Sequence, residues 1–223
     1  MLLLISSVAP LAVADTLRSL PSFRLFAIGA GLNAFSSYGI GNFMPSFLIR
    51  SHGFGPLEVG TSLALISGIG GAIGTFAGGF FADRLARNDK RWYMWIASIP
   101  SAINVPLILA AVMLPDPNMA LVCLFFGVMI GGFYLGPVIA MAHALVRPSM
   151  RAMASAVLFL ILNLIGLGMG PLCVGLLSDA FAPSFGSESL RYAMAVMSFI
   201  NIAAAVFFAL AARKLIADLK LNS

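Results

Sequence analysis

Charged residues are concentrated in one short stretch of this chain, 83–91, which holds six charges in nine residues. Two carboxylates alternate there with three arginines and one lysine, although only 9% of the residues of the whole chain are charged. Such a stretch could be a catalytic centre, a nucleic-acid-binding patch or a loop at a membrane surface. The composition of the rest of the chain decides among these three.

Other side chains with catalytic or metal-binding chemistry are few and far apart. The two histidines, His52 and His143, are expected at opposite ends of the helical bundle, so they cannot form a two-histidine metal site. The chain contains no Cys-x-x-Cys spacing and no phosphate-cradling glycine loop. The interiors of its apolar segments contain no Asp, Glu, Lys or Arg. We therefore expect neither an enzyme nor a metal or cofactor site.

The composition predicts a membrane protein. Of the 223 residues, 61% are hydrophobic, and the mean hydropathy is +1.02. A soluble domain is about 45–50% apolar and about 25% charged, so this chain has too few charges to cover a soluble surface. The excess apolar surface is expected to face the lipid bilayer.

Uncharged runs predict six transmembrane helices, because each run holds at least 21 residues and a helix needs roughly 20 residues to cross a bilayer. Membrane strands would be about half as long and would alternate in polarity, which these runs do not. The expected fold is therefore an all-α membrane protein. The helices are expected at about 25–49, 59–82, 92–115, 118–146, 152–178 and 192–212.

Loop charges predict the orientation of these helices. Eleven Lys and Arg residues fall on the face that receives both termini and the 83–91 stretch, and only Arg50 and Arg191 fall on the other. Basic residues accumulate in cytoplasmic loops, so both termini are expected in the cytoplasm. A cleaved signal peptide within residues 1–20 would invert this arrangement, and the segment lacks the positive start of such a peptide. Because the basic residues are scattered over short loops, we expect no nucleic-acid partner.

Several residues recur at an offset of 96 positions. Gly70, Gly74, Gly79 and Asp83 correspond to Gly166, Gly170, Gly175 and Asp179, and Gly31 and Tyr38 correspond to Gly127 and Tyr134. Three helices separate the two copies, so the copies have opposite orientations in the membrane. The pattern predicts a 3+3 inverted repeat, an arrangement that many secondary transporters use for alternating access. The alternative, close packing of helices through small residues, would explain the matching glycines but not the matching aspartates.

Mildly polar residues near the middle of the helices are candidates for a substrate cavity, with interhelical hydrogen bonding as the alternative. Glycine and proline pairs in the first and fourth helices are expected to interrupt those helices as hinges, with plain kinks as the alternative. Asn104 and Asn201 have no partner in the repeat and are interpreted as structural. The candidate cavity-lining residues are Asn33, Ser37, Tyr38, Asn42, Tyr134 and Asn163, and the candidate hinges are Gly39, Gly41, Pro45, Gly136 and Pro137.

The loop pattern Gly79-x-x-x-Asp83-Arg84-x-x-Arg87-x-x-Lys90-Arg91 resembles the signature between the second and third helices of each half of major facilitator superfamily transporters. Stretches 45–53, 78–93, 135–146 and 151–179 resemble the C-terminal half of bacterial spinster-like members. One departure is Ala86, which stands where the signature usually has glycine.

The resemblance implies that residues 21–223 are the C-terminal six-helix half of a secondary, ion-coupled transporter of a small organic solute in the bacterial inner membrane. Residues 1–20 would be the inter-half linker or a truncated remnant. An N-terminal six-helix half, on a separate chain or lost by truncation, would be the partner and would supply the ionisable residues that are missing here. The implied cytoplasmic gating loop consists of Gly79, Asp83, Arg84, Arg87 and Arg91.

An alternative is a non-transporting truncated membrane protein or assembly partner that only packs against another membrane protein. An intramembrane enzyme is disfavoured by the absence of catalytic residues.

Overall fold

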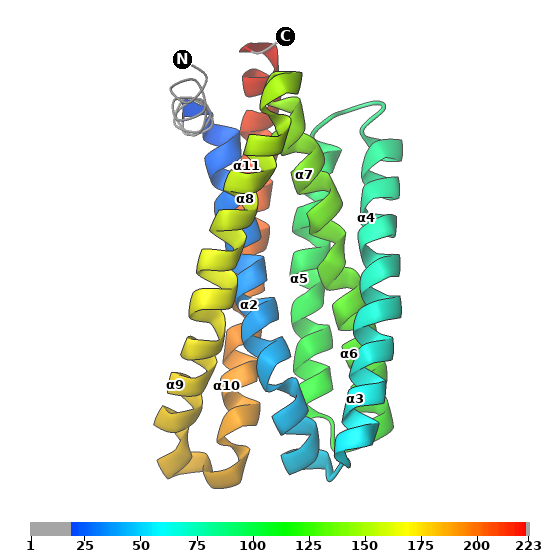
Figure 1. The fold of residues 1–223 in the computed structure, drawn as a ribbon, viewed down its shortest axis with the longest axis vertical. Helices are drawn as coiled ribbons and strands as arrows, with labels where there is room; N and C mark the ends of the chain where they lie inside the picture. The colour runs from blue at the N-terminus through cyan, green and yellow to red at the C-terminus, as the bar shows by residue number, and fades with distance from the viewer. Residues whose placement is uncertain (1–18, 222–223) are drawn as a thin grey trace, which may run out of the picture.

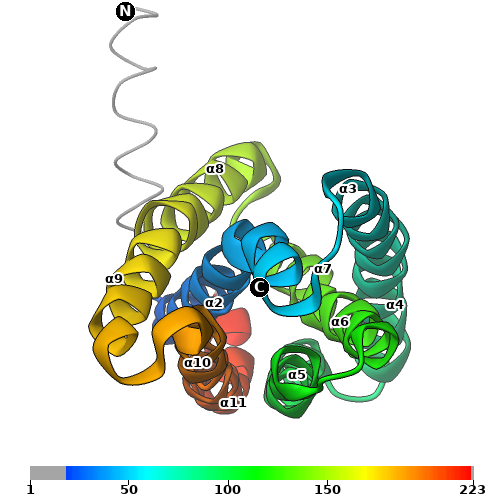
Figure 2. The same cartoon turned by 90° about the horizontal axis from the view of Figure 1, so that it is seen from below.

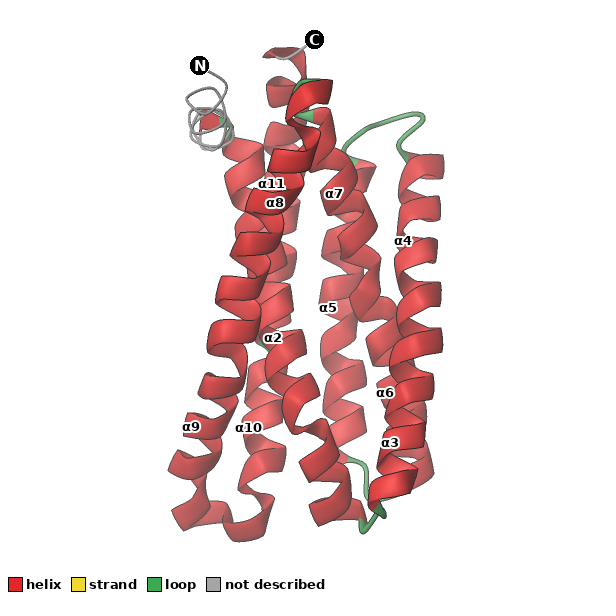
Figure 3. Ribbon diagram, viewed as in Figure 1, coloured by secondary structure: helices red, strands yellow, loops and turns green. Residues whose placement is uncertain are grey.

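The computed structural model describes residues 19–221, and within that range the chain is helical, with no strand (Figure 3). The predicted linker or remnant at 1–20 lies almost wholly outside the described residues. The main helices are α2 (Pro21–His52), α3 (Pro56–Leu65), α4 (Gly71–Leu85), α5 (Trp92–Met113), α6 (Pro117–Gly131), α7 (Leu135–Ala144), α8 (Arg151–Leu162), α9 (Gly168–Phe185), α10 (Ser189–Ser198) and α11 (Ile200–Leu221).

Three pairs of these helices are continuous except for one irregular turn. The π-helical turn η1 (Ile66–Gly70) joins α3 to α4, the 3-10 turn η2 (Gly132–Tyr134) joins α6 to α7, and the π-helical turn η4 (Asn163–Leu167) joins α8 to α9. By length and apolar composition, four helical stretches among the described residues qualify to cross a membrane. These stretches are Pro56–Leu85, Trp92–Met113, Pro117–Ala144 and Pro148–Lys220.

Helix ends follow capping residues rather than the charges that bound the uncharged runs. Proline occupies the first turn of α2, α3 and α6, where its missing N–H costs nothing. Gly53 ends α2 with a φ of 70°, a left-handed conformation that glycine adopts without strain. α9 likewise continues to Phe185, beyond the boundary expected at residue 178, and the glycine that follows it, Gly186, also has a positive φ, of 55°.

The helices form two groups, which Figure 2 shows side by side. One group contains α2, α8, α9, α10 and α11, and the other contains α3 to α7. Contacts of α5 with α10 and α11 join the two groups. Large apolar side chains that are fully buried, such as Phe26, Met94 and Phe208, fill the core at these contacts.

The first and last described helices meet at one end of the molecule (Figure 1). The backbone N–H of Ser22, in the first turn of α2, donates a 2.7 Å hydrogen bond to the carboxylate of Asp218 in α11. Asp218 is only 4% exposed. A buried carboxylate is stabilised there because the N-terminus of α2 presents unpaired N–H groups and a positive dipole end.

The expected interruption of the first helix is wrong. α2 is one continuous helix of 32 residues, with Pro45 inside it. The ribbon bends in the second half of this helix without breaking (Figure 1), as expected where proline removes one backbone hydrogen bond. The expected interruption of the fourth helix is present, since the α-helix gives way to η2 at Gly132.

Candidate functional site

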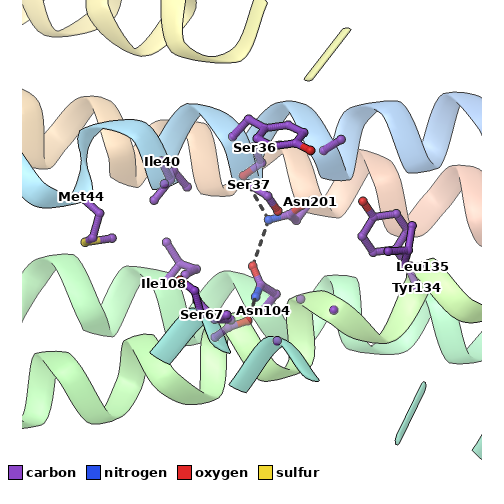
Figure 4. A pocket seen from close by; sticks show the side chains of 18 of the residues that line it. Ser36, Ser37, Ile40, Met44, Ser67, Asn104, Ile108, Tyr134, Leu135 and Asn201 are labelled. Atoms are coloured by element: carbon purple, nitrogen blue, oxygen red, sulfur yellow. Dashed lines mark hydrogen bonds between the residues drawn. The ribbon is translucent and has the colours of Figure 1, made fainter. Parts of the chain in front are cut away.

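A cavity of about 570 Å³ lies between the two helix groups. Helices of both groups form its walls, including α11 of the first group and α5 of the second (Figure 4). Most of the lining is apolar, and no Asp, Glu, Lys, Arg or His contributes to it. Eight polar side chains do: Ser36, Ser37, Tyr38, Ser67, Asn104, Tyr134, Asn163 and Asn201.

A hydrogen-bonded network connects the two helix groups beside this cavity. The Asn201 amide nitrogen donates to Asn104 Oδ1 at 3.1 Å and to Ser36 Oγ at 3.2 Å. Asn104 Nδ2 donates in turn to the Gly127 carbonyl at 2.6 Å. Figure 4 shows Ser36, Asn201 and Asn104 in a row across the cavity. The network joins α2 and α11 of one group to α5 and α6 of the other.

Four of the six predicted cavity residues line the cavity: Ser37, Tyr38, Tyr134 and Asn163. Asn33 does not. It is 2% exposed, and its amide nitrogen donates to Ser101 Oγ of α5 at 2.9 Å. Asn42 also lies outside the lining, where it is exposed and donates to the Tyr38 carbonyl one turn earlier.

Sequence reasoning missed four polar residues of the cavity: Ser36, Ser67, Asn104 and Asn201. Asn104 and Asn201 were interpreted as unpaired in the repeat, yet they hydrogen bond to each other. They are 97 positions apart, one more than the repeat offset. A tolerance of one residue in the offset would have found this pair.

The two π-helical turns lie at matching points of their helices. Ser67 is the second residue of η1 and Asn163 is the first residue of η4; both are exposed, both line the cavity, and they are 96 positions apart. A π-helical turn inside an α-helix is rare and is frequent at functional sites. The cavity therefore has one such turn in each of two facing helices.

The candidate hinge residues have different surroundings. A Cβ on Gly39 would meet the Gly170 carbonyl oxygen at 2.9 Å, so this glycine allows α2 and α9 to approach closely. Gly41 is exposed and lines the cavity. Gly136 packs against Gly79, with a distance of 3.4 Å from its ideal Cβ to the Gly79 Cα. Pro137 is buried within α7.

The predicted gating loop lies at the end of the molecule that holds the described termini (Figure 1). Asp83 accepts a 2.8 Å hydrogen bond from the Tyr93 hydroxyl at the start of α5. Within residues 19–221, Arg84, Arg87 and Arg91 form no ion pair with Asp83, and all three are exposed.

The opposite end carries a second group of charged residues. Arg191 forms a 2.8 Å ion pair with Glu188, and its guanidinium lies 5.8 Å from the centre of the Phe47 ring. His52 packs edge-on against the same ring. Burial and the nearby Arg191 lower the pKa of His52 below its usual value, so its imidazole stays neutral at physiological pH. Among the described residues, no group of three or more His, Cys, Asp or Glu could hold a metal ion.

Comparison with known proteins gives the class of this fold and cavity. The model of the Major Facilitator Superfamily matches residues 26–220, nearly the whole described chain. The chain belongs to this superfamily, which consists of membrane transporters and not of enzymes. This confirms the resemblance that its loop pattern indicated.

Particular relatives narrow the comparison. An MFS-type efflux pump of Mycolicibacterium smegmatis (strain ATCC 700084 / mc(2)155) is 34% identical over 177 residues, which are 79% of this chain and 41% of the pump. A solved bacterial homologue of the human lysosomal transporter Spinster, inward-facing and unoccupied, is 27% identical with a TM-score of 0.85. That match covers 93% of this chain and 51% of the other.

The occupied, inward-facing form of that homologue has a TM-score of 0.81 at 27% identity and matches 89% of this chain and 50% of its own. The chain is therefore similar to spinster-like members of the superfamily. It spans about half the length of the relatives that it matches.

Proposed function

We propose that this chain is the C-terminal six-helix half of a secondary transporter that moves a small organic solute by alternating access. The observation that carries the proposal is the mainly apolar cavity between the two helix groups, in a chain that matches half of an inward-facing transporter. The cavity would form one wall of the transport pathway. Its polar side chains would contact the solute.

Six membrane crossings arranged as a 3+3 inverted repeat are part of the proposal. The helical segments Pro56–Leu85 and 151–185 each contain one π-helical turn at a matching position. Gly74 of the first segment packs on the Met129 carbonyl, and Gly170 of the second packs on the Phe35 carbonyl. The first segment ends beside the described termini, and the second ends at the opposite end (Figure 1). These features support two copies with opposite orientations.

The orientation follows from the positive-inside rule. Arg84 lies in the last turn of α4, and the loop after it carries Arg87, Lys90 and Arg91. This loop lies at the end where α2 begins and α11 ends (Figure 1). We infer that this end is cytoplasmic. The bacterial efflux pump among the relatives supports the bacterial inner membrane as the location.

A second six-helix half, on the same polypeptide or on another, would complete the transporter. The relatives are about twice as long as this chain, which supports such a partner. The cavity lining contains no carboxylate or basic group. Ion coupling usually requires ionisable groups inside the membrane, so we infer that the second half supplies them.

The gating loop has a defined role in this scheme. Asp83 and Tyr93 tie the end of α4 to the start of α5, while the exposed Arg84, Arg87 and Arg91 remain available to the second half. We propose that they contact it when the cytoplasmic side closes. This scheme retains two hinge candidates. Gly41 lies in α2, which bends near Pro45, and Gly136 lies just after the irregular turn η2.

The experiment is co-reconstitution of this chain with a second six-helix half, for which the N-terminal half of the mycobacterial efflux pump is the available choice. We expect the two halves to co-purify in a one-to-one complex. Proteoliposomes with both halves should move an uncharged amphipathic fluorescent dye, and those with this chain alone should not. If the halves do not associate, or if this chain alone transports as well as the pair, the half-transporter proposal is wrong and an independent or assembly role is favoured.

A further inference from the structure

One acceptor beside the cavity has no hydrogen-bond donor. The side-chain oxygen of Asn201 is buried and unpartnered, and the residue as a whole is only 2% exposed. Asn201 nevertheless belongs to the cavity lining. A buried acceptor without a donor is unfavourable, so its persistence needs an explanation.

The hydrogen-bonded network fixes which end of the Asn201 amide carries the nitrogen. At one end of the network, the Gly127 backbone carbonyl can only accept, so Asn104 must direct its amide nitrogen there, at 2.6 Å. Asn104 therefore presents its oxygen to Asn201. That oxygen can only accept, and Asn201 must supply the proton at 3.1 Å.

The other end of the network imposes the same direction. Ser36 donates its single hydroxyl proton to the Met197 carbonyl at 3.2 Å, so its oxygen accepts from Asn201 at 3.2 Å. Both protons of the Asn201 amide are thus committed, one to Asn104 and one to Ser36. Exchanging the amide nitrogen and oxygen would leave two acceptors facing each other at Asn104. The unpartnered atom is therefore the oxygen.

A donor for this oxygen has to come from outside the network. The cavity lining contains no charged side chain, and apolar groups such as Ile40, Met44 and Ile108 dominate the walls. Among the described residues, this wall supplies no carboxylate to compensate a cationic donor. An uncharged hydroxyl or amide N–H on an apolar body fits this surface best.

We propose that Asn201 Oδ1 is a recognition site for an uncharged hydrogen-bond donor, a hydroxyl or an amide N–H, on an amphipathic solute in the cavity. The network through Asn104 and Ser36 holds the amide so that its oxygen is kept for the solute. This inference extends the proposed function by naming the solute's chemistry.

Asn33 provides a matched comparison within the same chain. Its side-chain oxygen is also buried and unpartnered, and it too is 2% exposed, but it does not line the cavity. Its amide nitrogen donates to Ser101. A solute in the cavity should reach Asn201 and not Asn33.

The test uses the full chain, labelled with ¹⁵N-asparagine, in phosphatidylcholine nanodiscs, whose headgroups offer no donor. The probes are 1-decanol and 1-methoxydecane, in which a methyl group replaces the hydroxyl proton. The Asn201 side-chain amide signal should shift saturably with decanol, with on the order of tenfold tighter binding than for the ether. The Asn33 signal should stay in place.

Variants sharpen this test. Asn201→Ala should remove the preference for the alcohol, and Asn33→Ala should keep it. If Asn201→Ala does not fold, the two probes on the unaltered chain still decide the question. Equal binding of both probes, equal shifts at Asn33, no shift at Asn201, or a water that remains at Asn201 in saturating decanol would each overturn the inference.

The outcome also separates this inference from the proposed function. If the chain prefers the alcohol but does not assemble with a second half, the recognition site is supported and the half-transporter proposal is wrong. If the two halves assemble and transport but the chain binds the alcohol and the ether equally, only the recognition-site inference is wrong.

Discussion

Two segments of the chain, Pro56–Leu85 and 151–185, have the same design until they approach their ends. Each begins as an α-helix, passes through a π-helical turn beside the cavity and continues as an α-helix whose glycine packs on a neighbouring backbone carbonyl. They differ after that point. Asp83 of the first is hydrogen bonded to Tyr93 and is followed by the basic loop, whereas Asp179 of the second is exposed and no arginine follows it closely.

We interpret this difference as a separation of helix architecture from the proposed gating. Features that the two segments share, the π-helical turn and the close glycine contact, set how each helix lies along the cavity. Features that only one has, the Asp83–Tyr93 contact and the exposed arginines, lie at one end of the molecule. Substitutions at matching positions should therefore have equal effects in the shared part and unequal effects at the ends.

The largest effect is expected at the shared glycines. A Cβ at Gly74 would meet the Met129 carbonyl, and one at Gly170 would meet the Phe35 carbonyl, so Gly74→Ala and Gly170→Ala should each destabilise the chain by about 3 kcal/mol. The measurement is thermal unfolding in detergent. Gly60→Ala is the control, because nothing lies within 4 Å of its ideal Cβ and alanine favours a helix. Unfolding at the wild-type temperature for either variant would show that the close approach is not required.

The next effect is expected in the network between the helix groups. Asn104→Ala removes the side-chain hydrogen bond to the Gly127 carbonyl and leaves one Asn201 proton without a partner, and should cost about 1–2 kcal/mol. Chemical denaturation of the chain in detergent measures this cost. Asn42→Ala is the control, since Asn42 is exposed and bonds only within its own helix. Equal stability of the two variants would contradict a structural role for the network.

A smaller and unequal effect is expected at the two aspartates. Asp83→Asn and Tyr93→Phe should each cost about 0.5–1.5 kcal/mol, because each weakens or removes the same hydrogen bond. Asp179→Asn should leave stability unchanged. A double substitution of Asp83 and Tyr93 should cost less than the sum of the single ones. Thermal unfolding of the four variants checks this, and equal losses at Asp83 and Asp179 would refute the asymmetry.

The smallest effect on stability is expected at the loop arginines. Arg84→Gln, Arg87→Gln and Arg91→Gln should each change the free energy of unfolding by less than about 0.5 kcal/mol, since exposed charges contribute little. In the assembled transporter the same changes should alter the rate of transport. A large loss of stability in the isolated chain would mean that these residues are structural.

Sequence alone predicted the class of fold, the membrane environment and the superfamily, because these depend on composition, run length and one loop pattern. It proposed Ser37, Tyr38, Tyr134 and Asn163 for the cavity, and these residues line the pocket between the helix groups; their contact with a solute stays a prediction. It failed for Asn33, because depth in the membrane does not say which face of a helix a residue occupies.

Other features depend on contacts between distant segments. The pairing of Asn104 with Asn201 needs two helices to meet, and the Asp83–Tyr93 hydrogen bond needs the loop to fold back. The π-helical turns have no residue type that marks them, so the matching turns at Ser67 and Asn163 were missed. Helix ends were displaced because capping, and not charge, ends a helix.

The central claim is that both segments line one pathway that opens alternately to the two sides of the membrane. The most direct test places a single cysteine at Ser67 or at Asn163, with Cys123 and Cys173 changed to serine, in the complete transporter in oriented vesicles. Over time, a membrane-impermeant thiol reagent should label the cysteine at each position from either side of the membrane. In any one conformation of the transporter, the cysteine should be accessible from one side only. Labelling of both positions from only one side under all conditions would contradict the account.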